Sequence, residues 1–334
     1  MDAFEYAKPS TVKEAIGLLG PDWEDASVFA GGTDLISLLK DDIEETKRLV
    51  NIKSVGELHA VQNEHGGLRI GAAVTIEQLL SASDVRKEFP AITDAADGIR
   101  SPQLRNMGTV AGELCQRPRC WYYRNGMGLL ALDKDGKSLV AQGDNRYHAI
   151  FGNSGPAKFV SPSSLAPALV ALDAQLHIEG PQGGRDVSAA DFFVVPQKPG
   201  EREHALSPSE IVTHIIVPAS SHGMRSATYE VRHKEGMDWP FAAAAVALKM
   251  NASAVESARI VLGHVAPKPW PADDAAKWLA GKTINEETAA KAGDAAAQGA
   301  TPLSRNGYKV QLVRVAVKRA LLAAVGERSA AAMA

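Results

Sequence analysis

Apolar residues in the first fifty positions recur at two spacings, and each spacing predicts a different element. A spacing of three and four predicts a short helix over residues 12–19, and the capping-box pair Thr11 and Glu14 marks its start. The segment 27–30, apolar at its last three positions, predicts a buried strand, and the apolar residues at 35–39 predict a second helix. The amino-terminal part of the chain is therefore expected to contain both strands and helices.

The same patterns continue downstream. Residues 68–72 predict a strand, and Thr75 with Gln78 forms a second capping signature. The polar, proline-containing stretch 196–208 is predicted to be a linker, and a new unit is expected to begin near Ser221. The elements predicted for the second half are a helix then a strand over 168–178, strands at 224–232 and 258–262, an alanine-rich helix at 241–248, helices at 272–279, 286–297 and 310–321, and a frayed tail from Ala330.

Composition excludes several classes of protein. The 334 residues include 36 Lys and Arg against 39 Asp and Glu, a net charge of −3, and 45% are hydrophobic. This composition rules out disorder, collagen and coiled coil, and the length suggests two or three domains. The weak negative charge argues against nucleic acid as a partner, and no apolar run is long enough for a membrane span.

Two features favour a reducing compartment. Two cysteines are too few for a disulfide framework, and the acidic start of the chain lacks the basic, then apolar pattern of a signal peptide. We therefore expect a cytoplasmic protein, periplasmic only if it is exported together with a partner.

The most specific local motif is Ala30, Gly31, Gly32, Thr33, Asp34 and Leu35. Two glycines after a strand allow unusual torsions and let backbone N–H groups approach an anion, and the next helix adds its positive end. The Thr33 hydroxyl is a further donor to a phosphate. The alternative is a tight strand-to-helix turn with a capping Thr or Asp. No G-x-G-x-x-G occurs, so this is not a Rossmann fingerprint.

A second glycine-threonine loop follows at 105–112 and carries Asn106, Gly108, Thr109 and Gly112. Two such loops are suited to clamp the two phosphates of one dinucleotide; the alternative is a pair of unrelated turns. The loop lies in a window, 100–124, whose five arginines face one acid, so its charge is about +4. That surplus indicates an anionic ligand or acidic partner surface, or else a solvated loop.

Metal and catalytic motifs are weaker. Cys115 and Cys120 have four residues between them, whereas a zinc or iron–sulfur site needs about four ligands, and His148 is a remote further candidate. Two reduced thiols or one local disulfide are therefore favoured, and no metal ligand is assigned. Residues 135–138 lack the spacing of a P-loop and are predicted to be a polar turn. We assign no catalytic residue.

Taken together and in order, AGGTDL, RNMGTVAG with ELCQRPRCWYYR, SPSSLAPALVALDA and VLGHVAPKPW carry a family resemblance. The chain resembles the FAD-binding medium subunit of xanthine dehydrogenase-type molybdenum hydroxylases, the family of carbon monoxide dehydrogenase and aldehyde oxidoreductase medium subunits. The resemblance implies an α+β fold, with a two-lobed FAD-binding domain of the vanillyl-alcohol-oxidase type and a smaller α/β domain. The implied units are 1–55, 56–220 with a long insertion at 125–158, and 221–328.

The resemblance also implies the cofactor site. The first loop, residues 30–35, is expected to hold the FAD pyrophosphate, and the second to lie against the flavin and its phosphates through Asn106, Gly108, Thr109 and Gly112. Glu113 stands where relatives have Asn, and Ser164 stands where many have an Asp that contacts the FAD sugar chain. Tyr147 and Ile150 are suggested as flavin neighbours. Arg232 and Asp238 are weaker candidates, with an exposed ion pair as the alternative.

The implied function is electron transfer. A partner molybdenum-cofactor large subunit would oxidise the substrate, a [2Fe–2S] small subunit would relay electrons, and FAD here would pass them to an acceptor. Some relatives bind a [4Fe–4S] cluster through four cysteines, but the insertion here contains none, so we expect no such cluster. The alternatives are a stand-alone flavin oxidoreductase and a docking subunit that has lost FAD.

Overall fold

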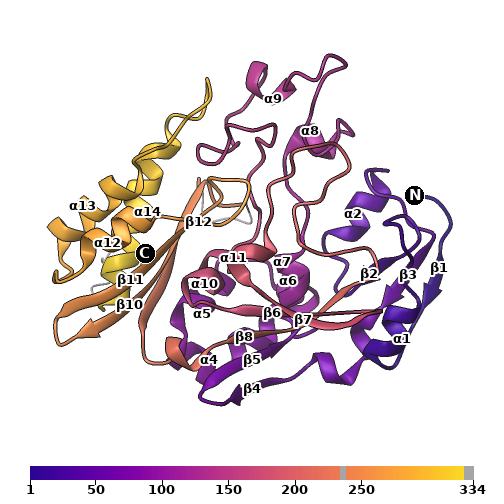
Figure 1. Cartoon of the computed structure of the whole chain (residues 1–334), viewed down its shortest axis with the longest axis horizontal. Coiled ribbons are helices and arrows are strands. Elements are labelled where there is room, and N and C mark those ends of the chain that lie inside the picture. The colour runs from indigo at the N-terminus through magenta and orange to yellow at the C-terminus, as the bar shows by residue number, and fades with distance from the viewer. Residues whose placement is uncertain (234–237, 327–334) are drawn as a thin grey trace.

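The computed structural model describes residues 1–233 and 238–326, which form three β-sheets with helices packed around them (Figure 1). The tail from Ala330, and the last two residues of the unit expected to end at 328, lie outside the described residues. In the view of Figure 1 the sheets follow one another across the molecule, with the first at the amino-terminal side and the third beside α13 and α14.

The first sheet is small and parallel, in the order β1-β3-β2. Parallel neighbours need a crossover connection, and the two short predicted helices provide the crossovers. Thr11 accepts a hydrogen bond from Glu14 N, which confirms the predicted helix start. The elements are β1 (Glu5–Ala7), α1 (Val12–Gly17), β2 (Ser27–Phe29), α2 (Leu35–Lys40) and β3 (Arg48–Asn51).

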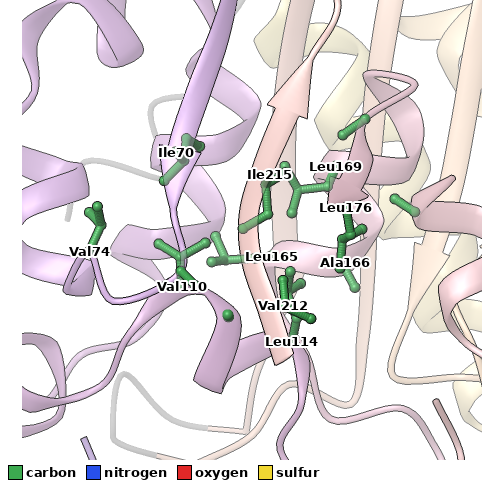
Figure 2. Close-up of a cluster of buried hydrophobic side chains, with 14 of the residues drawn as sticks. Ile70, Val74, Val110, Leu114, Leu165, Ala166, Leu169, Leu176, Val212 and Ile215 are labelled. Atoms are coloured by element: carbon green, nitrogen blue, oxygen red, sulfur yellow. The ribbon is translucent and has the colours of Figure 1, made fainter. Parts of the chain in front are cut away.

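The second sheet is antiparallel, in the order β4-β5-β8-β6-β7. Its inner face packs on α7 and α10 through apolar side chains such as Ile70, Val110, Leu165 and Ile215 (Figure 2). The strands are β4 (Val61–Glu64), β5 (Gly67–Gly71), β6 (Gln175–Gly180), β7 (Gly183–Ser188) and β8 (Ile211–Val217). The helices are α3 (Ile76–Ser81), α4 (Ser83–Glu88), α5 (Pro90–Asp97), α6 (Pro102–Met107), α7 (Val110–Leu114), α10 (Leu165–Ala171) and α11 (Ala189–Phe192).

The third sheet is antiparallel, in the order β12-β11-β10-β9. One face packs against α12 and α14, with α13 behind them, while α5 and α10 of the middle unit pack on the other. The elements are β9 (Arg225–Val231), β10 (Ala242–Asn251), β11 (Ala254–Gly263), β12 (Trp270–Pro271), α12 (Asp273–Leu279), α13 (Glu286–Ala296) and α14 (Lys309–Ala324). The three helices predicted for this region are confirmed.

The prediction of a helix over 241–248 is wrong, because these residues form β10. Even-numbered positions such as Ala244 and Val246 join the core of the third unit, whereas Ala245 and Ala247 join the core of the middle unit. A strand covered on both faces is apolar at every position, so it lacks the alternation that identifies half-exposed strands. The alanines keep the helices close on both sides.

Two long segments also differ from expectation. The stretch 196–208 connects α11 to β8 inside the middle unit, so the prediction of a linker is wrong. The region after α8 (Trp121–Arg124) and α9 (Leu139–Gln142) returns onto the third unit, where Ile150 N and Phe151 N donate to Val265 O. Ile150 is fully buried in that core, so the suggestion that it neighbours the flavin is wrong.

Candidate functional site

The two glycine loops touch each other, although about seventy-five positions separate them in the sequence. A Cβ on Gly31 would lie 1.8 Å from Met107 O and 3.0 Å from Gly108 Cα. Gly32 has a φ of +68°, and a Cβ there would lie 2.5 Å from the Phe29 ring. Both positions therefore require glycine, one because of the close approach and one because of its backbone conformation.

The backbone at this junction, the contact between the two glycine loops, offers hydrogen-bond donors. In the described part of the chain, the N–H groups of Gly31, Gly32 and Thr33 donate no hydrogen bond to a protein atom. The second loop is held rigidly, since Ile76 N donates to Gly108 O and Thr109 Oγ1 accepts from Gly112 N at the start of α7. A rigid bend beside unpaired N–H groups is suited to bind an anion.

Two neighbouring clefts meet at the loops, with volumes of about 230 and 170 Å³. Thr33, Asp34, Gly112 and Gln116 line both clefts, so a single extended molecule can occupy them together. The predicted site residues that line the first cleft are Ala30, Gly31, Gly32, Thr33, Asp34, Leu35, Thr109 and Gly112; Gly108 and Ser164 line the second. The donor set and the two joined clefts fit a dinucleotide.

Asn106 lies apart from these residues. Its side chain is among the linings of neither cleft, and its amide nitrogen donates to Pro102 O, 2.8 Å away within α6. The structure therefore brings Gly108, Thr109 and Gly112 of the second loop into the site and leaves the Asn106 side chain on its own helix.

Asp34 makes a set of contacts that sequence patterns did not reveal. Its Oδ1 lies 2.9 Å from Arg124 Nη2 and 3.1 Å from Arg119 Nη2, and its Oδ2 accepts from Arg117 N at 2.8 Å. It makes no side-chain cap on α2. The capping alternative for Asp34 is thus wrong, because the carboxylate instead joins the first loop to the residues that follow the second.

Most of the charge of the basic window is also balanced inside the chain. Arg117 pairs with Glu44 and Glu203, each at 2.5 Å, and the Arg117 side chain is only 11% exposed. Arg105 pairs with Asp97. Burial works against the charge of Arg117, but Glu203 and the other neighbours raise its pKa. A solvated loop is therefore the wrong interpretation; Arg117 lines the first cleft, and Arg100 and Arg119 line the second.

The Glu113 side chain contacts the start of α10, although its position directly after Gly112 suggests a contact with the flavin. Its carboxylate is buried and accepts from Ser163 Oγ at 2.5 Å and Ser164 N at 2.6 Å, at the start of α10. Ser164 Oγ in turn donates to Glu230 Oε1 at 2.6 Å. Burial raises the pKa of Glu113 to about 7. The one sequence feature that could have indicated these contacts was the presence of an acidic residue directly after Gly112.

Arg232 and Asp238 do not form an exposed ion pair. Arg232 Nη2 lies 2.5 Å from Glu230 Oε2, both side chains are largely buried, and Arg232 also donates to the Asp238 backbone carbonyl. Arg232 and Asp238 both line the second cleft. Tyr147 belongs instead to a third cleft of about 320 Å³, which shares Arg119 and Asp238 with the second.

Cys120 contacts the insertion rather than Cys115. Its Sγ lies 3.1 Å from His148 Nε2, and burial raises the pKa of the Cys120 thiol while it lowers the pKa of His148 to about 4. Burial also raises the pKa of Cys115 to about 12. The thiols and the imidazole are therefore neutral at pH 7. Among residues 1–233 and 238–326, no three His, Cys, Asp or Glu side chains gather as metal ligands.

Known proteins share this architecture. Residues 2–220 match the family model described as the FAD binding domain in molybdopterin dehydrogenase, and residues 227–324 match the CO dehydrogenase flavoprotein C-terminal domain. A solved carbon monoxide dehydrogenase from Hydrogenophaga pseudoflava, in a form without the Mo-pyranopterin moiety, superimposes with a TM-score of 0.75 at 29% identity. That comparison covers 98% of this chain and 99% of the other.

Curated relatives match over nearly their whole length. The carbon monoxide dehydrogenase medium chain of Hydrogenophaga pseudoflava is 30% identical over 96% of each chain. The aldehyde oxidoreductase FAD-binding subunit PaoB of Escherichia coli (strain K12) is 32% identical over 99% of this chain and 100% of that protein. In the described residues no helix is long and apolar enough to cross a membrane. With family models matching both parts of the chain, this protein belongs to the FAD-binding medium subunits of the molybdopterin hydroxylases, which are oxidoreductase subunits.

Proposed function

We propose that this chain carries FAD and transfers electrons within a molybdenum hydroxylase complex. A partner subunit with the molybdenum cofactor oxidises the substrate, and a [2Fe–2S] subunit delivers the electrons to this chain. The electrons then leave to an external acceptor. The relatives that support this assignment are a carbon monoxide dehydrogenase medium chain and an aldehyde oxidoreductase FAD-binding subunit.

The residues that would hold FAD follow from the clefts. Backbone N–H groups of Ala30–Leu35, together with Thr109 and Gly112 in the first cleft, would surround the diphosphate, and Gly108 and Ser164 would lie beside the rest of the molecule in the second cleft. FAD supplies reversible electron transfer that amino acid side chains cannot perform. The chain itself binds, orients and shields the cofactor. Asn106 takes part only through its place in the loop.

The proposed units follow the sheets. Residues 1–55 and 56–220 are the two lobes of the FAD-binding domain, and 221–328 form the carboxy-terminal domain, with 125–158 as an insertion that packs on the third sheet. The observation that carries the proposal is the contact between Gly31 and Met107 O, beside N–H groups without protein partners. A fully paired turn would have no donors to offer a diphosphate.

The test is to purify the chain with the products of neighbouring genes and identify its cofactors. We expect a flavin absorbance band, FAD in an acid extract by mass spectrometry, and molybdenum and iron in the co-purified subunits. A colourless protein that still binds the partners would establish the docking alternative. A flavoprotein that purifies without molybdenum or iron partners would establish the stand-alone oxidoreductase.

A further inference from the structure

Glu113 connects two helices that are far apart in the sequence. It lies on α7 next to Gly112, and both residues line the second cleft. The hydrogen bonds from Ser163 Oγ and Ser164 N bring the carboxylate to the amino-terminal end of α10, about fifty residues later. Gln116 Nε2 donates to the same carboxylate at 3.2 Å. Loss of this group would therefore leave several buried donors without an acceptor.

The hydrogen bonds continue into the third unit. Ser164 Oγ donates to Glu230 on β9, and Glu230 pairs with Arg232 at 2.5 Å. Arg232 Nη2 also donates to Gly98 O at 2.7 Å, just after α5. One connected chain thus runs from α7 through the start of α10 to β9 and back to the middle unit. Because most of the residues in this series of hydrogen bonds line the second cleft, the series helps to set the width of that cleft.

The negative charges of Glu113 and Glu230, the two carboxylates in this series of hydrogen bonds, are compensated to different extents. Glu230 has the guanidinium of Arg232 beside it, whereas none of the hydrogen-bond donors that reach Glu113 carries a charge. Five other charged side chains line the second cleft together with Glu113: Asp34, Arg100, Arg119, Arg232 and Asp238. Glu230 lies across Ser164, and Cys115 follows at the end of α7.

We propose that Glu113 is a positioning residue whose carboxyl holds α10 and the Glu230–Arg232 pair in place, and whose charge sets how tightly the cleft retains an anionic dinucleotide. The identity of that ligand rests on the proposed function. Ionised Glu113 adds a negative charge directly after Gly112, where the diphosphate is expected, and repels it. Protonated Glu113 removes the repulsion and keeps its place at α10, because a carboxylic acid still accepts from Ser164 N.

The titration range supports this coupling. Burial raises the pKa of Glu113 from 4.5 to about 7, so its charge changes near neutral pH. Proton binding and dinucleotide binding then favour each other by the same factor, because linkage is reciprocal. A change of one unit charge on Glu113, close to the dinucleotide in a partly buried cleft, is enough to change the affinity in this way.

The experiment measures FAD dissociation from the holoprotein by flavin fluorescence at pH 6 and pH 8. We expect wild type to bind FAD at least about threefold more tightly at pH 6. Glu113→Gln keeps an acceptor for Ser164 N but cannot ionise, so this variant should bind FAD without the pH dependence. Glu256→Gln, an exposed position paired with Lys249, is the matched control and should behave as wild type. A Glu113→Gln protein with the wild-type pH dependence would overturn the proposal.

A second measurement uses the protein without flavin. The pKa of Glu113 is higher in the folded state, so its contribution to stability is present below pH 4.5 and is lost as pH rises toward 7. We expect urea midpoints of wild type to fall over this range relative to Glu113→Gln, and Glu113→Ala to be less stable than both at pH 5. Parallel wild-type and Glu113→Gln curves would reject the proposal. If no variant binds FAD while the curves diverge, the proposed function fails and the positioning role stands.

Discussion

The carboxylate of Asp34 lies 2.9 Å from the guanidinium of Arg124, ninety residues farther along the chain. Both side chains are largely buried, at 13% and 16% exposure. Since Asp34 belongs to the first glycine loop and Arg124 to the segment after the second, this pair and the Arg117 N–H contact fix the two loops relative to each other. The shape of the cleft therefore depends on a carboxylate that also lines it.

Replacing Asp34 with Asn should be strongly destabilising. It leaves Arg119 and Arg124 in a largely buried site without their carboxylate, a change that typically costs about 3–5 kcal/mol. Urea unfolding at pH 7 measures the difference. The control is Asp42→Asn, an exposed partner of the amino terminus, which should stay within about 0.5 kcal/mol of wild type. Equal stabilities of the two variants would show that the Asp34 pairs contribute little.

Gly31→Ala should abolish FAD retention. A methyl group at this position would lie 1.8 Å from Met107 O, so the loops must separate and the N–H groups move. The amount of FAD released per mole of purified protein is the measurement. Gly56→Ala is a suitable control, because a Cβ there meets nothing within 4 Å. A Gly31→Ala protein with full FAD content would contradict the assignment of this junction to the diphosphate.

His148 should make the protein sensitive to acid. Burial lowers the pKa of His148 to about 4, while the unfolded chain binds this proton near pH 6.5. The unfolded state then binds more protons between pH 6.5 and 4, so stability falls as pH falls, by about 3 kcal/mol in total. Urea unfolding of His148→Gln should show a shallower loss than wild type. The exposed His233→Gln should follow wild type, and a matching slope in His148→Gln would refute this origin.

The chain alone should bind no iron–sulfur cluster. Cys120 is engaged with His148, Cys115 is buried as a neutral thiol, and a cluster needs about four ligands. Iron analysis of the chain purified without partners should give a value near zero that Cys115→Ser leaves unchanged. Stoichiometric iron that disappears in Cys115→Ser would overturn this expectation.

Local patterns predicted much of the fold. The capping pair Thr75 and Gln78 forms a complete capping box at the start of α3, and the apolar stripe of the last helix faces the third sheet as α14. These features succeed because a helix end and a helix face are decided by residues three or four apart. The prediction of a helix at 241–248, where the structure has β10, was wrong for the opposite reason. The apolar character of β10 comes from layers on both sides, while alanine by itself favours a helix.

For the site, the sequence by itself determined where the two glycine loops lie and that their backbones could offer donors. The tertiary structure decided the partners of each charge: that Asp34 meets Arg119 and Arg124, and that Glu113 turns to Ser164 rather than outward. The physical reason is range. Backbone torsions depend on neighbours in the chain, whereas the burial of a charge depends on groups fifty to ninety residues away that only folding brings within 3 Å.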